Sequence, residues 1–263
     1  MMVSFSVGET IGTSFRVWFR NLIPFTILSV LIHAPVLIYT LVAMQDLEAA
    51  AASPVTGQIV RIIDTFLGVV LTASITYGVV MELRGQRASI GQNIGVGLGR
   101  FFPALGVSLL SYLIIGLVTG AFVLPGIALG SPWMTIVFGA VGFILSFLPF
   151  FVAVPASVLE RPGVIGALKR SLELTSGKRA ALFGMFVVLI IMFFVGSCIF
   201  GMAVGGAAVA SGSTAAPKWP LYMGLAIGPL LSSFFSVLCA VTYYFLRSER
   251  EGIGADELAR VFE

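Results

Sequence analysis

The sequence is poor in charge, in histidine and in cysteine. Only 10% of its 263 residues are Asp, Glu, Lys or Arg, whereas 58% are hydrophobic, and there is a single histidine. A soluble domain carries about 25% charged residues, so this composition excludes a soluble globular protein. The two cysteines, Cys198 and Cys239, both lie in apolar runs, where they are most simply buried hydrophobic residues and indicate no disulfide framework.

Long apolar runs occupy most of the chain. A helix needs about 20 apolar residues to cross the hydrocarbon core of a bilayer. Every backbone polar group in that core must be hydrogen-bonded within the protein, and an apolar run of this length achieves this as an α-helix. The fold class that we expect is therefore all-α, a polytopic membrane protein with one integral domain over 1–263 and a short cytoplasmic tail at 248–263. The six predicted transmembrane helices are 22–44, 66–81, 104–124, 134–155, 180–201 and 221–246.

The basic residues predict the orientation in the membrane. Of the fifteen Lys and Arg residues, only Arg61 and Lys218 fall on the side opposite the two termini, so thirteen fall on the side of the termini. Basic residues are retained on the cytoplasmic side during insertion. We expect both termini to be cytoplasmic, in a bacterial inner (plasma) membrane.

Three short segments resemble one another and indicate an internal repeat. Residues 6–19 align without gaps on 89–102, with five of fourteen positions identical, and 163–176 is a weaker third copy. Apolar residues recur at helical spacing in each copy, which predicts amphipathic helices at 7–19, 90–101 and 164–174 that lie in the cytoplasmic interface with their apolar faces in the acyl region. The expected repeat units, each an interfacial helix plus a helical hairpin, are 6–83, 89–156 and 163–247.

Basic side chains near these segments are candidate contacts for lipid headgroups. Each is worth on the order of 1 kcal/mol beside an anionic leaflet. We therefore expect membrane lipids, anionic at the cytoplasmic face, as partners; protein partners or a homo-oligomer stay open, and nucleic acid is not expected. The candidates are Arg16, Arg20, Arg100, Lys169, Arg170, Lys178 and Arg179.

Two stretches, 154–178 and 240–258, carry motifs of a known group of proteins. The motif positions are Pro155 and Glu160, Arg170 with Ser171, Leu174 and Thr175 with Gly177, and Tyr243 to Arg247. With these motifs the chain resembles a bacterial family of six-span integral membrane proteins that includes the membrane domain fused to some glycerophosphoryl diester phosphodiesterases. The resemblance implies six membrane spans. The family has no agreed activity, so the resemblance implies no particular function. The sequence offers no soluble segment that could hold the phosphodiesterase domain.

Few polar residues lie within the predicted spans. His33 is in the middle of the first span and is the candidate intramembrane polar site; we favour a neutral, hydrogen-bonded histidine beside Pro35 over a proton or substrate site. Arg61 and Asp64 are three residues apart on one helix face, which predicts an ion pair at the interface.

No catalytic pattern, metal-ligand spacing or cofactor motif accompanies these residues, so we expect neither an enzyme nor a bound cofactor. Four Gly-x3-Gly spacings, which include Gly116 with Gly120 and Gly126 with Gly130, favour close helix packing.

Two functions fit this pattern. The first is a non-enzymatic membrane scaffold or accessory protein that contacts lipid through three cytoplasmic interfacial helices, in envelope or lipid homeostasis. The alternative is a small-molecule or lipid transporter or channel with His33 in its pathway. A polar cavity that reaches His33 would favour the transporter, and a filled core would favour the scaffold.

Overall fold

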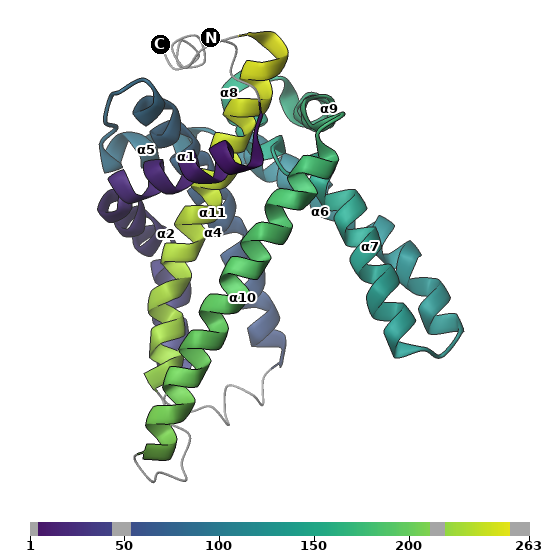
Figure 1. Cartoon of the computed structure of the whole chain (residues 1–263). Coiled ribbons are helices and arrows are strands. Elements are labelled where there is room, and N and C mark those ends of the chain that lie inside the picture. The colour runs from purple at the N-terminus through teal and green to yellow at the C-terminus, as the bar shows by residue number, and fades with distance from the viewer. Residues whose placement is uncertain (1–4, 44–53, 211–218, 253–263) are drawn as a thin grey trace.

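The computed structural model describes residues 5–43, 54–210 and 219–252, and all regular structure in these ranges is helical (Figure 1). Lys218 and most of the predicted tail, 253–263, lie outside the described residues. The helices are α1 (Val7–Arg20), α2 (Leu22–Ala43), α4 (Pro54–Leu83), α5 (Ile90–Gly99), α6 (Phe101–Ala128), α7 (Pro132–Phe150), α8 (Ala153–Glu160), α9 (Gly163–Thr175), α10 (Arg179–Ala210) and α11 (Trp219–Glu251).

Six helical segments are long and apolar enough to cross a membrane, which confirms an integral membrane protein of all-α class. They correspond to α2, α4, α6, α7 continued by α8, α10 and α11. The second is longer than predicted, because α4 begins at Pro54 and includes the polar residues 58–64. Proline is favoured at the first position of a helix, where no backbone N–H is required, and no further proline follows it in α4.

The fourth span is broken, although the sequence predicts one continuous helix over 134–155. α7 ends at Phe150 and α8 begins at Ala153. Pro155 has no N–H for the carbonyl of Phe151, and a proline in a helix interior breaks or kinks it. Other helices satisfy the carbonyls at the break: the Cys239 thiol donates to the Phe151 oxygen at 2.9 Å, and the Ser171 hydroxyl donates to the Pro149 oxygen at 2.7 Å.

Short helices gather at one end of the long ones. α1, α5, α8 and α9 lie at the top of Figure 1, and we refer to this as the short-helix end. The helices α1, α5 and α9 confirm that the three predicted amphipathic segments are helical. Their relation by a repeat stays a prediction.

The apolar face of α1 is covered by the protein itself, which differs from the expected burial in the acyl region. Phe15 packs on Phe234 of α11 with ring centroids 4.6 Å apart, and the Trp18 indole donates to the Ser233 hydroxyl at 2.9 Å. Ile90 and Ile94 of α5 pack against the same core. An amphipathic pattern shows that a helix has an apolar face but does not determine whether protein or lipid covers it.

Candidate functional site

A cavity of about 500 Å³ lies within the membrane-spanning part of the molecule. All six apolar helical segments contribute to its wall, so its shape depends on how the whole bundle packs. One lining residue from each segment, in chain order, is His33, Thr72, Ser108, Phe147, Phe186 and Ser236.

One wall of the cavity carries hydroxyl groups. Thr72 of α4 and Ser236 of α11 lie with their oxygens 3.1 Å apart. The Thr72 hydroxyl also donates to the Gly68 carbonyl at 3.0 Å, so its single hydrogen is used and Ser236 donates across the helix interface. Ser108 of α6 is a further, buried hydroxyl in the lining. This wall therefore offers uncharged hydrogen-bonding oxygens in an apolar setting.

Another part of the cavity lining is apolar and consists of aromatic rings. Phe147, Phe151 and Phe186 line the same cavity, and their rings pack on one another with centroids 4.9 Å apart for Phe151 and Phe186 and 5.4 Å apart for Phe147 and Phe186. Mutual edge-to-face packing holds such rings in place. The cavity is consequently amphipathic, with a rigid apolar surface and a set of hydroxyls.

His33 and Asp64 contribute two ionisable side chains to the lining of the cavity. The Nδ1 atom of His33 lies 3.0 Å from the Ser29 carbonyl oxygen, which can only accept, so Nδ1 carries a hydrogen. Nε2 then faces Asp64 Oδ1 at 3.8 Å, too far for a direct hydrogen bond. The His33 side chain is 9% exposed and that of Asp64 is 53% exposed. A proton gained by His33 would therefore be placed beside a carboxylate.

A second, smaller cavity of about 160 Å³ adjoins this pair. His33, Asp64 and Ser232 line both cavities. The histidine and the aspartate thus lie at the boundary between two hollow spaces.

The ion pair predicted between Arg61 and Asp64 is replaced by the pair of Asp64 with His33. Spacing by three residues places two side chains on one face of a helix but does not require them to meet. Asp64 instead approaches the histidine of the neighbouring helix α2, and Arg61 is exposed.

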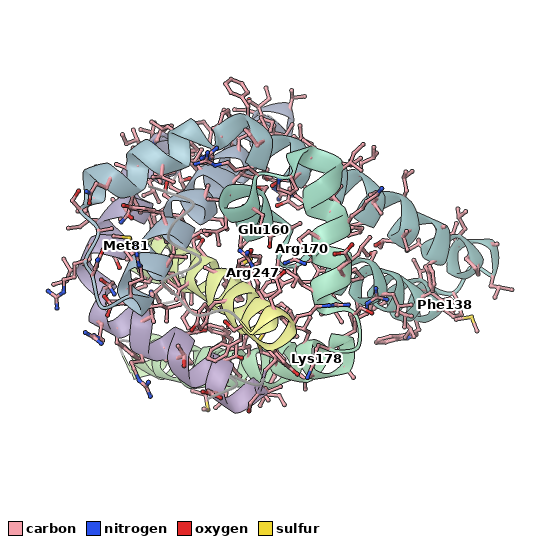
Figure 2. The ribbon with its side chains drawn as sticks, turned by 90° about the horizontal axis from the view of Figure 1, so that it is seen from above. Met81, Phe138, Glu160, Arg170, Lys178 and Arg247 are labelled. Atoms are coloured by element: carbon pink, nitrogen blue, oxygen red, sulfur yellow. The ribbon has the colours of Figure 1, made fainter. Side chains whose placement is uncertain are left out.

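A network of ion pairs lies at the short-helix end, where Figure 2 shows Glu160, Arg170 and Arg247 around α11. The Arg170 guanidinium pairs with Glu160 at 2.7 Å, and the Tyr243 hydroxyl donates to Glu160 at 2.5 Å. Arg247 lies 3.6 Å from Glu160 and donates to Glu251 at 2.8 Å; Arg170 also pairs with Glu251. These side chains come from α8, α9 and α11, so the network joins three helices.

The residues of the sequence motifs converge in this network. Glu160, Arg170, Tyr243 and Arg247 are all positions of the motifs that carry the family resemblance. Arg170 is only 18% exposed and pairs with carboxylates, so it links helices of this network. Its role as a headgroup contact stays a prediction.

The other candidate headgroup contacts fall into three groups. Arg20 pairs with Glu82 at 3.0 Å, and Lys178 pairs with Glu249 at 2.6 Å. Arg100 is half-buried and lines a separate pocket. The remaining three, all exposed, are Arg16, Lys169 and Arg179.

The hydroxyl wall was not predicted from the sequence. A usable signal was present, because Gly68, Thr72 and Thr76 recur every four residues and so share one face of an otherwise apolar helix. In the described ranges no group of three or more His, Cys, Asp or Glu side chains gathers as a metal site would require. Comparisons with protein-family models, with curated proteins and with solved structures found no match for this chain.

Proposed function

We propose that this protein binds an amphiphilic molecule, a lipid or a small molecule of similar character, in the large cavity and transports it with His33 in the pathway. The observation that carries the proposal is a cavity lined by every apolar helical segment and reaching His33. Its volume of about 500 Å³ lies within the range of small-molecule sites, roughly 300–1,000 Å³.

The chemistry of the wall supports an amphiphile in particular. The phenylalanine rings suit an apolar body, for which each buried methylene is worth about 0.8 kcal/mol. The hydroxyls of Thr72, Ser108 and Ser236 suit a polar group. Tyr112 and Phe235 line the cavity and yet are 53% and 39% exposed, so the cavity opens on the apolar surface of the bundle. A lipid-soluble ligand has a lateral route of entry.

A scaffold that contacts lipid is the second candidate function. It is favoured by the exposed basic residues Arg16, Lys169 and Arg179 at the short-helix end, which suit an anionic leaflet. The coverage of the apolar face of α1 by α11 weakens it, because that face is no longer available to the acyl region.

We further propose that the short-helix end and both termini are cytoplasmic, in a bacterial inner membrane, on the basis of the thirteen-to-two distribution of basic residues. Cysteine labelling in a background without Cys198 and Cys239 tests this. A thiol at Lys169 should react only from the inside and one at Leu129 only from the outside, and both positions are exposed. The reverse pattern would overturn the orientation.

Filling the cavity should stop transport. Ser108→Phe and Ser236→Phe each place a ring in the cavity. We expect the rate of transfer of a fluorescent phospholipid in proteoliposomes to fall about tenfold or more, because a loss of about 1.4 kcal/mol in binding free energy already lowers ligand affinity tenfold. Leu117→Phe is the matched control, because Leu117 is on the same helix as Ser108 but 66% exposed and outside the lining. Equal rates in all four proteins, at equal incorporation, would exclude transport through this cavity and favour the scaffold.

The same assay examines His33. Glutamine keeps a polar side chain but cannot take up a proton, so His33→Gln should lower the rate and remove its dependence on pH. The other titratable side chains that line the two cavities are Asp64, Tyr112 and Cys239. Asp64→Asn is the companion variant. A loss of thermal stability with unchanged rate and pH profile would assign His33 a structural role.

A further inference from the structure

His33 and Asp64 present two hydrogen-bond acceptors to one another across the cavity lining. Because the Nδ1 atom of His33 carries its hydrogen toward the Ser29 carbonyl, Nε2 keeps a lone pair, and an ionised carboxylate has only lone pairs to offer. Nε2 and Asp64 Oδ1 lie 3.8 Å apart. Neither atom supplies a hydrogen to the other, so a donor group that reaches both would satisfy the pair.

The charge of the lining favours a cationic donor. Among the described residues that line the two cavities, Asp64 is the one carboxylate, and none is a lysine or an arginine. Arg61, one turn before Asp64 on α4, is exposed and lines neither cavity. A carboxylate in apolar surroundings attracts cations and repels anions. The lining therefore selects against an anionic ligand.

Aromatic rings provide a second attraction for a cation. The lining of the larger cavity includes Tyr112, Phe147, Phe151, Phe186 and Phe235. Phe235 lies one helical turn from Ser232, which lines both cavities together with His33 and Asp64. The faces of aromatic rings attract cations, and the same rings cover the apolar part of a ligand. The cavity thus combines a carboxylate, an acceptor nitrogen and several rings.

We infer that the cavity binds a lipophilic primary ammonium ion, whose N–H groups donate to His33 Nε2 and Asp64 Oδ1 while its apolar body lies among the rings. An ammonium nitrogen carries three N–H groups, so it can donate to both acceptors at once. The inference rests on the proposed function, because it names the ligand class of the same cavity. The ammonium group belongs either to a free amine or to the headgroup of phosphatidylethanolamine.

A proton competes with this ligand. Protonation of His33 places a hydrogen on Nε2, so the atom no longer accepts, and the positive imidazolium repels the ammonium and pairs with Asp64. Protonation and ammonium binding therefore oppose each other, and each weakens the other by the same factor. The affinity for the ammonium should fall as the pH is lowered.

Other titratable groups near His33 do not produce this competition. Tyr112 of α6 and Cys239 of α11 line the larger cavity, and both are already uncharged in their protonated forms, so a lower pH leaves their charge unchanged. α5, which also packs on α2, has no titratable side chain. Apart from Asp64, the described titratable side chains of α1, α4 and α11 that line neither cavity include Glu9, Arg61 and Glu82.

Equilibrium binding of fluorescent naphthyl compounds to the full-length protein in an uncharged detergent tests the inference. Naphthylmethylamine is the ammonium probe, and its trimethylammonium derivative keeps the charge but has no N–H group. Naphthylmethanol is neutral and naphthoate is anionic. The variants are Asp64→Asn and His33→Gln. Glu173→Gln is the matched control, because Glu173 is an exposed carboxylate outside both cavities.

We expect naphthylmethylamine to bind at least about tenfold more tightly than the other three compounds, and Asp64→Asn to remove this preference, as the loss of a charge-assisted hydrogen bond implies. Glu173→Gln should match the parent protein. At pH values where carboxylates stay ionised, the affinity should fall with pH in the parent protein and stay constant in His33→Gln. Displacement of the probe by phosphatidylethanolamine but not by phosphatidylcholine would assign the ammonium to a lipid headgroup, and no displacement would assign it to a free amine.

Equal binding of the amine, the alcohol and naphthoate, no binding of the amine, or an unchanged affinity in Asp64→Asn would overturn the inference. The proposed function fails separately. If the naphthyl compounds bind without regard to charge but are lost in Ser108→Phe, the cavity remains a site for amphiphiles and only the ammonium ligand is excluded.

Discussion

Glu160→Gln is expected to lower the free energy of unfolding by about 3 kcal/mol. Glu160 accepts from Tyr243 and pairs with Arg170, and its side chain is only 17% exposed. Breaking a buried ion pair costs about 3–5 kcal/mol, because the remaining charge stays desolvated. The lower end applies here, since Glu251 continues to pair with both Arg170 and Arg247.

Unfolding in mixed micelles of increasing SDS content measures this loss. Glu173→Gln is the matched control, because Glu173 also faces Arg170, at 3.7 Å, but is 61% exposed. Exposed pairs contribute about 0–1 kcal/mol, so the control should unfold close to the parent protein. Equal stability of the two variants would mean that the network around Glu160 is solvated and does not hold α8, α9 and α11 together.

Gly126→Ala is expected to destabilise the hairpin of α6 and α7 by about 1–3 kcal/mol, the usual cost of overpacking. A Cβ atom at Gly126 would overlap the backbone of Thr135 on α7, and a backbone cannot move aside as a flexible side chain can. The two helices would have to separate at this point.

Gly120→Ala on the same helix is the control, because a Cβ there meets nothing within 4 Å. Alanine has a higher helix propensity than glycine by about 1 kcal/mol, so this variant should match or exceed the parent protein in thermal stability. A loss at Gly120 equal to that at Gly126 would contradict the close approach of α6 and α7 at Gly126.

The apolar helices could be predicted because hydropathy alone specifies them. The three short helices also followed from the spacing of apolar residues such as Val7, Ile11 and Phe15. Glycine pairs were less informative. Gly116 and Gly120 have the same spacing as Gly126 and Gly130, but of these four only Gly126 has a neighbour close enough to exclude a methyl group.

The cavity could not be predicted, because it depends on contacts between helices that are distant in the chain. Asp64 has Arg61 within one turn and His33 on another helix, and local spacing favours the wrong partner. Thr72 and Ser236 are 164 residues apart. The break between α7 and α8 could not be predicted either. Prolines also occur within α2 and α11, and these helices continue through them, so a proline in an apolar run does not by itself indicate a break.

The hairpin of α6 and α7 projects from the rest of the bundle in Figure 1, and many of its large side chains are exposed, including Leu113, Leu117 and Ile136. In a bilayer, acyl chains surround it on most sides. Part of the boundary of the large cavity is then made of lipid, and the lateral pressure of the membrane acts directly on the spacing between this hairpin and the other helices. The thickness and acyl composition of the bilayer are therefore expected to influence the distance between this hairpin and the other helices.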